Sequence, residues 1–221
     1  MKYLGLALYS EGRTDDYFLR PLLLRLCDHL CLTEGQEPVD VSDVVPLADA
    51  PDTAGAPRDA RILAAAQRHR GAWQVLFVHG DGEADPGVAR TDRVQPGIDA
   101  VHAVFGEDGF AVAVIPVRET EAWALHDSAA LRTVLNTNLD DQQLGLPVGA
   151  RAIEGAQDPK RILEGAFLAT KPSGQRRRKG VAPLLASIGE QVDLARLGEL
   201  PSFGRLKDEL RMALRSLHVI A

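Results

Sequence analysis

The sequence has only two cysteines among its 221 residues, Cys27 and Cys31. They stand four residues apart in an apolar helical pattern that also contains His29, so a zinc site has to be considered. Such a site needs a second pair of ligands at matching spacing, and the sequence offers none. We therefore interpret both cysteines as buried residues of a helix.

Long hydrophobic runs are also missing, since no stretch approaches the roughly 18 apolar residues of a transmembrane helix. The first ten residues have too short an apolar run for a signal peptide and no cleavage-site pattern. With 45% hydrophobic and 25% charged residues, the composition is that of an ordinary globular protein. We expect a sizeable core, a cytoplasmic location and no membrane partner.

Charge is unevenly distributed along the chain. Residues 1–150 contain 12 Lys and Arg against 23 Asp and Glu, whereas residues 151–221 contain 13 against 8. Acidic residues around a cation and basic residues elsewhere would suit a polyanionic substrate, although a solvated charge imbalance gives the same numbers.

Strand and helix patterns alternate four times in the first half of the chain. The strands are expected at 2–9, 39–47, 75–79 and 110–117. A helix follows each of the first three strands, the second helix at about 57–69 and the third at about 97–105, and a loop is expected from Pro86 to Pro96 before the third helix. This alternation predicts an α/β, Rossmann-like domain over residues 1–127, with a mainly parallel sheet flanked by helices.

Residues 128–221 lose strand character and predict a helical extension packed on that domain. The expected helices are 129–135, 159–168, 182–188 and 203–217. Between them lies a basic run, 171–180, which we expect to be a mobile loop until it meets a partner.

Acidic residues follow two of the predicted strands directly. Glu11 comes after the first strand and Asp81 after the third, so both would face the crevice where strand order reverses in a doubly wound sheet. With Glu83, Asp85 and Glu121 they would form an oxygen cage suited to Mg²⁺ or Mn²⁺.

Two other interpretations of these acidic loops remain. Asp-Gly and Glu-Ala-Asp are good turn sequences, and Glu11 could simply pair with Arg13. An EF-hand is excluded, because Pro86 stands where that loop requires glycine and a strand precedes it.

The motif Glu11-Gly12-x-x-Asp15 after one strand, with Asp81-x-Glu83 after another, resembles the TOPRIM domain of topoisomerases, DnaG-type primases and OLD-family nucleases. The resemblance covers about residues 1–125. Further similarity, in 118–123, 158–160 and 200–203, is to small bacterial TOPRIM-like proteins that often accompany SMC-like or ABC-type ATPases in phage-defence loci.

The resemblance implies roles for several residues. Glu11 matches the family's general acid/base or metal ligand, Asp15 completes its motif, and Asp81 matches the first aspartate of Asp-x-Asp. Glu83 departs from the second aspartate, so Asp85 is a candidate to share that position. The chain has no tyrosine placed as in a topoisomerase and no primase zinc cysteines, which leaves strand passage and primase activity unsupported.

The function that we predict is metal-assisted cleavage of phosphodiester bonds in DNA or RNA. Arg118 or Lys160 would stabilise the phosphate, although either could equally form a surface ion pair. The basic run would guide the nucleic-acid backbone through four charged side chains, Arg176, Arg177, Arg178 and Lys179. The alternative is a solvated loop, because no aromatic residues interleave with the run to stack on bases.

Two alternatives of other classes stay open. The chain could be a regulatory subunit that works through an SMC- or ABC-type ATPase partner and is inactive alone. It could also be a phosphatase or receiver-like phosphoryl-transfer domain, for which Asp81 would serve but Glu11 stands where aspartate is usual. A homo-oligomer is equally open.

Overall fold

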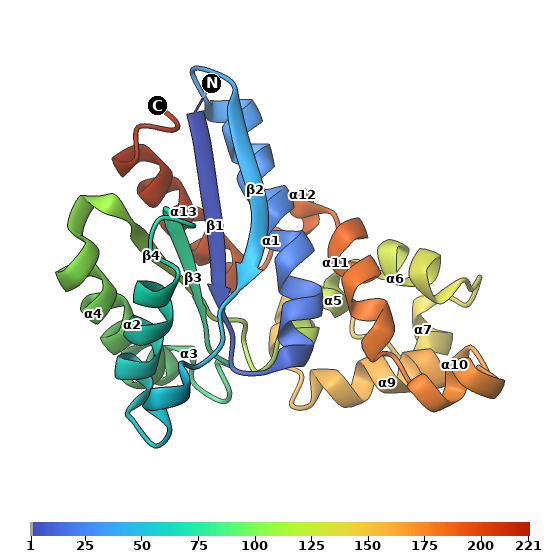
Figure 1. Cartoon of the computed structure of the whole chain (residues 1–221). Helices are drawn as coiled ribbons and strands as arrows, with labels where there is room; N and C mark the ends of the chain where they lie inside the picture. Colours follow the sequence, from blue (N-terminus) through green and yellow to red (C-terminus); the bar gives the residue numbers. More distant parts are fainter. Residues whose placement is uncertain (1) are drawn as a thin grey trace.

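The computed structural model describes residues 2–221 as an α/β fold with a four-stranded, all-parallel sheet (Figure 1). The strands are β1 (Lys2–Tyr9), β2 (Val39–Pro46), β3 (Val75–His79) and β4 (Phe110–Val114), in the order β2-β1-β3-β4. The predicted fold class is therefore confirmed. Among the described residues, no helix combines the length and apolarity needed to span a bilayer.

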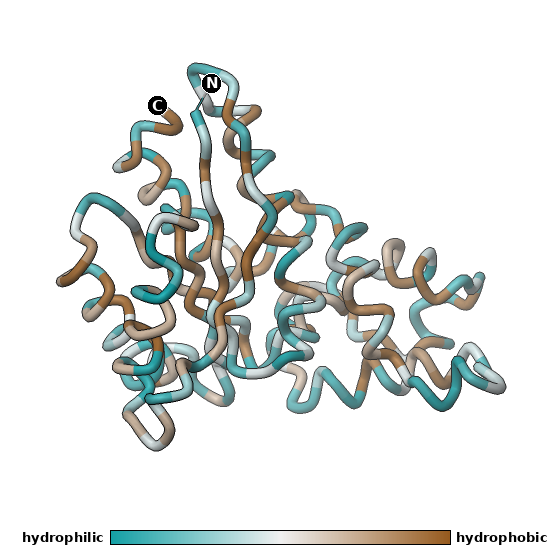
Figure 2. Tube along the Cα trace, in the orientation of Figure 1, coloured by the Kyte–Doolittle hydropathy of each residue, from teal (hydrophilic) through white to brown (hydrophobic). Residues whose placement is uncertain are grey.

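Successive residues of each central strand enter two different cores, because side chains alternate between the faces of a sheet. Leu6 and Leu8 of β1 join Phe77 of β3 on one face, whereas Ala7 joins Val78 on the other. Both faces are thus buried, as the near-continuous apolar strands require. In Figure 2 the central strands are mostly brown on the hydropathy scale.

Different helices cover the two faces. Core residues of α1 (Arg13–Glu34) and α13 (Pro201–Ser216) pack with Leu6 and Leu8. Core residues of α2 (Arg58–Arg68) and α4 (Gln95–Phe105) pack with Ala7 and Val78.

The helical extension shares the first of these cores rather than building its own. Phe167 and Phe203 belong to the same apolar cluster as the strand residue Leu6 and Trp123 of α5 (Glu121–His126), and Figure 1 shows much of the extension beside α1. The helices of the extension are α6 (Ser128–Leu135), α7 (Asp141–Leu144), α8 (Ala150–Glu154), α9 (Pro159–Ala169), α10 (Gly174–Lys179), α11 (Leu185–Gln191), α12 (Leu194–Leu197) and α13.

Two predicted loops are helical in the structure. Residues 86–94 form α3 (Pro86–Ala89) and a π-helical turn, Arg90–Val94, that leads into α4. The Asp85 side chain caps α3 by accepting hydrogen bonds from the backbone N–H groups of Gly87 and Val88. Pro86 fits the first turn, because an N–H at that position would have no acceptor within the helix. Residues 174–179 of the basic run form α10.

An ion pair between the ends of two helices generates a pH prediction. Arg211 of α13 donates from Nε at 2.8 Å and from Nη2 at 2.9 Å to the carboxylate of Glu34 in α1, and this hydrogen bonding lowers the pKa of Glu34. A lowered folded-state pKa stabilises the fold above the ordinary pKa and loses that effect as pH falls through the lowered value.

We expect Glu34→Gln to lower the free energy of unfolding by about 1 kcal/mol at pH 7 and by little at pH 3, as measured by urea denaturation. Asp208→Asn is the matched control, because Asp208 contacts the same guanidinium at 3.0 Å but is largely exposed. An equal loss at both pH values would contradict a role for the Glu34 charge.

Candidate metal site

The pairing of β1 with β3 brings two polar loops together at the carboxyl ends of the strands. Tyr9 lies opposite Val78 in the register, so the residues that follow each strand meet where strand order reverses. The backbone N–H of Asp81 donates to Glu11 Oε2 at 2.8 Å. The predicted neighbourhood of Glu11 and Asp81 is confirmed.

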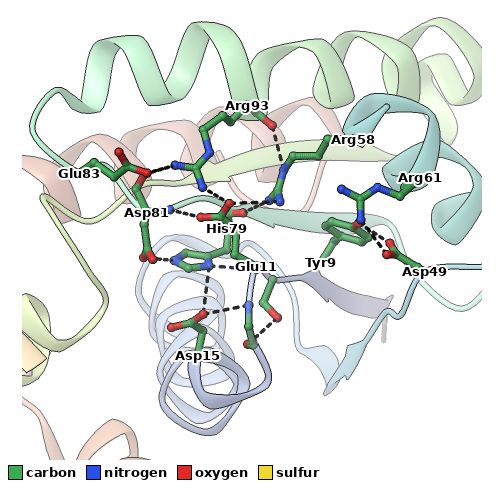
Figure 3. A network of polar contacts seen from close by, with 12 residues as sticks. Tyr9, Glu11, Asp15, Asp49, Arg58, Arg61, His79, Asp81, Glu83 and Arg93 are labelled. Atoms are coloured by element: carbon green, nitrogen blue, oxygen red, sulfur yellow. Dashed lines mark hydrogen bonds and ion pairs between the residues drawn. The ribbon is translucent and has the colours of Figure 1, made fainter. Parts of the chain in front are cut away.

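Asp15, His79 and Asp81 form the one group of metal-ligating side chains that gathers closely within residues 2–221 (Figure 3). One ligand atom from each residue lies within 4.8 Å of the others. Asp15 stands in the first turn of α1, His79 is the last residue of β3, and Asp81 follows in the next loop.

His79 is fully buried, and both of its ring nitrogens have polar neighbours. The N–H of Glu11 donates to Nδ1 at 3.4 Å, and Nε2 faces Thr120. That nitrogen lies 3.2 Å from Thr120 Oγ1, which itself donates to Asp15 Oδ1 at 3.1 Å. The imidazole thereby links the loop after β1 to the segment before α5.

Asp81 has a buried carboxylate oxygen, Oδ1, without a hydrogen-bond donor among the described residues. His79 Nε2 lies 3.4 Å from this oxygen, but the contact is not a hydrogen bond. An unpartnered buried oxygen is costly unless a cation or a donor approaches it. Two carboxylates and one imidazole nitrogen are a donor set that fits a divalent cation.

Burial raises the pKa of the carboxyls that line the cleft. The pKa of Asp15 is raised first by desolvation, with nearby Asp81 adding to the rise and His79 opposing it. Desolvation also raises the pKa of Glu121 to about 7. Five carboxyl side chains and one lysine, Lys160, line the cleft, and a bound cation would stabilise the ionised form of these carboxyls.

Glu11 is held by arginines rather than by the triad. Its Oε1 accepts from Arg93 Nη2 in a close contact and from Arg58 Nη1 at 3.4 Å. Arg58 also donates to the carbonyl of His79 at 2.5 Å and stacks over the ring of Tyr9. Figure 3 shows Arg93 between Glu11 and Glu83, where it compensates both carboxylates.

Three further residues predicted as metal ligands lie outside the triad: Glu121, Glu83 and Asp85. Glu121 lines the cleft beside Asp15 and Asp81. The Glu83 side chain is 71% exposed and accepts from Arg93 at 2.6 Å. Asp85 is occupied as the N-cap of α3. Neither Glu83 nor Asp85 belongs to the close triad.

The loops after β3 and β4 constrain one another. Glu83 N donates to Arg118 O at 3.1 Å, and both residues have positive φ angles, 47° and 65°. Gly82 is required between them, because a Cβ there would lie 2.3 Å from the carbonyl oxygen of Pro116. Such left-handed residues are held by their surroundings and cluster at functional sites.

The predicted phosphate-binding residues lie in two places. Lys160, in the first turn of α9, lines the cleft, and its backbone N–H donates to Glu119 Oε2 at 3.3 Å. Arg118 contributes its backbone to the loop bridge, and its side chain is not among those that line the cleft.

The basic run lies away from the triad. In Figure 1, α9 begins near the carboxyl ends of the strands, and α10 lies beyond its far end. Arg176 donates to Leu135 O at 2.7 Å and stacks over Phe167, so it contributes to the fold. Arg177, Arg178 and Lys179 are exposed on the short helix α10.

The sequence analysis did not predict four residues of the site: His79, Arg58, Arg93 and Thr120. His79 was included in the apolar strand, although a polar residue that ends a buried strand at the switch point is itself a signal. Thr120 adjoins a residue already considered, and two arginines could have been sought as partners for a buried Glu11.

Comparison of this chain with protein-family models, curated proteins and solved structures gives no significant match. The chemistry of the site is therefore derived from its own residues and their geometry.

Binding of Mn²⁺ provides a test that needs no substrate. We expect Mn²⁺ to raise the melting temperature of the wild type, with a stabilisation of about 2.7 kcal/mol at a concentration 100-fold above Kd. Asp15→Asn and Asp81→Asn should remove the shift, because each loses a ligand charge while keeping its shape.

Asp85→Asn is the matched control, since asparagine also caps a helix and Asp85 lies outside the triad. If Asp85→Asn loses the Mn²⁺ shift in melting temperature and Asp81→Asn keeps it, the ion binds at Asp85 rather than at the triad, and the proposed site is wrong.

Proposed function

We propose that this chain is a divalent-metal-dependent hydrolase that cleaves phosphodiester bonds in DNA or RNA. The observation that supports the proposal is the Asp15–His79–Asp81 triad at the switch point of a parallel sheet, with an unpartnered Asp81 oxygen. The TOPRIM resemblance of Glu11-Gly12-x-x-Asp15 and Asp81-x-Glu83 supports the same chemistry.

Asp15 and Asp81 would hold the cation, with the buried imidazole of His79 between them and Glu121 at the edge of the cleft. A bound Mg²⁺ or Mn²⁺ supplies an activated water and stabilises charge on the leaving oxygen. An imidazole in the donor set suits Mn²⁺ better than Mg²⁺, which prefers oxygen ligands.

Lys160 is the cationic side chain placed to bind the phosphate, because it lines the same cleft as Asp15 and Asp81. Glu11 orients Asp81 through its backbone N–H and aligns Arg93. The general acid/base role that the resemblance implies for Glu11 stays a prediction. We keep the cytoplasm as the proposed location for an enzyme with this substrate.

The activity test uses single- and double-stranded DNA and RNA with Mn²⁺ or Mg²⁺. We expect cleavage by the wild type and a loss of roughly 100-fold or more in Asp15→Asn and Asp81→Asn, because the cation is then no longer held. Asp85→Asn, purified in parallel, should cleave like the wild type and controls for contaminating nuclease.

Each assay is repeated with a co-encoded SMC- or ABC-type ATPase. Cleavage seen only with the ATPase, and removed by Asp81→Asn, would support the partner-activated alternative. Hydroxylamine-labile phosphate on Asp81 after incubation with acetyl phosphate, without cleavage of any nucleic acid, would favour the receiver-like alternative and contradict the nuclease proposal.

The basic helix α10 generates a separate prediction for affinity. If Arg177 and Arg178 contact phosphates, the double Arg177→Gln, Arg178→Gln variant should reduce the slope of log K against log salt concentration by about 2. Fluorescence anisotropy at several salt concentrations measures this slope. An unchanged slope would mean that α10 is a solvated surface; Arg176 is left intact because the fold uses it.

A further inference from the structure

A second cleft, of about 610 Å³, lies on the other side of Glu11, at the carboxyl ends of β1 and β2. Its volume is in the range of sites that take one small ligand or one nucleotide unit. Glu11 and Gly12 line both this cleft and the cleft of the triad, so the two are adjacent. A chain-like ligand could therefore run from one into the other.

One wall of this cleft is a stripe on α1 made of Arg13, Tyr17 and Arg20. Their spacing of four and three residues places them on one face of the helix. The side chain of Tyr17 is 54% exposed, although tyrosine is a large and partly apolar residue. An exposed aromatic ring between two cations is suited to a ligand that is both planar and anionic.

The positive charge of this stripe is not used within the fold. Arg13 makes no hydrogen bond or ion pair within residues 2–221. Arg20 donates only from Nε, to Val44 O at 2.8 Å, which fixes its stem and leaves its terminal nitrogens available.

The acidic residues of the cleft already have partners. Asp49 accepts from Arg61 at 2.8 Å and from the hydroxyl of Tyr9, and Asp16 accepts from Ser10 at 2.7 Å. Glu11 is compensated by Arg58 and Arg93. Asp16 keeps its charge, because a hydroxyl does not neutralise a carboxylate. Four arginines and three carboxylates line the cleft, so it has a net positive charge, and Arg13 and Arg20 are the arginines of this cleft without an ion pair among the described residues.

We infer that this cleft binds a single-stranded segment of nucleic acid that leads to the triad, with a base stacked on Tyr17 and phosphates bound by Arg13 and Arg20. The inference rests on the proposed function and adds to it the strand state of the substrate and its path. A single strand is required, because a base inside a duplex has no free face for the ring of Tyr17.

The test measures binding of a labelled oligonucleotide of about 12 residues by fluorescence anisotropy, with EDTA present so that nothing is cleaved. Tyr17→Ala should weaken binding of the single strand by roughly 5- to 100-fold, whereas Tyr17→Phe, which keeps the ring, should bind like the wild type. Arg13→Gln with Arg20→Gln should weaken binding and flatten its salt dependence by about two counterions.

Tyr3→Ala is the matched control. Tyr3 is 56% exposed and is the second residue of β1, whereas the cleft lies at the carboxyl end of that strand. The inference is overturned if Tyr17→Ala binds the single strand like Tyr3→Ala. It is also overturned if the wild type binds no oligonucleotide, or if Tyr17→Ala weakens duplex binding as much as single-strand binding.

Failure of this inference differs from failure of the nuclease proposal. Cleavage that depends on Asp81, with an unchanged KM in Tyr17→Ala, would contradict the role of the Tyr17 cleft and support the nuclease proposal. Tyr17-dependent binding of single strands without any cleavage in Mn²⁺ or Mg²⁺ would support the role of the cleft and contradict the nuclease proposal.

Discussion

The whole arrangement depends on β1 pairing with β3 on the side of the strand away from β2. This pairing reverses the direction in which strands are added, and it brings the loop after Tyr9 against the loop after His79. The hydrogen bond from Asp81 N to Glu11 closes the two loops together. A strand order that separated β1 from β3 would place the two carboxylates on different parts of the sheet edge.

Charge compensation divides the carboxylates of the site into two sets. On one side, Arg93 and Arg58 neutralise Glu11, so this carboxylate is stable without an ion. On the other side, Asp15 and Asp81 have only the imidazole of His79 between them and Lys160 nearby. Desolvation without enough positive charge is what raises the pKa values there, and it is also what makes a cation favourable.

Hydrophobic periodicity was enough to predict the α/β class and the strands, because both faces of the sheet are buried and the strands read as apolar runs. The approach of Glu11 to Asp81 also followed from position alone, since parallel strands end at the same edge. In these respects the local pattern and the global fold agree.

The membership of the triad could not be predicted in the same way. Glu83 and Asp85 have suitable side chains, but a left-handed backbone and a helix cap direct them elsewhere. Arg93 was missed because Pro86 and Pro96 suggested a loop, whereas both prolines stand at helix starts. Residue type is visible in a sequence, whereas side-chain direction depends on backbone angles set by contacts distant along the chain.

The helix α13 has a consequence for the order in which the protein forms. It packs on β4, and its Glu209 pairs with Arg90 in the π-helical turn that also carries Arg93. Arg90 and Glu209 are 119 residues apart in sequence. On the ribosome, the first four strands emerge long before this partner, so one face of β4 stays uncovered and the Arg93 segment lacks its anchor during that interval. The acidic loops are thus synthesised early, but the segment of the arginine that compensates Glu11 gains this contact only after Glu209 has been synthesised.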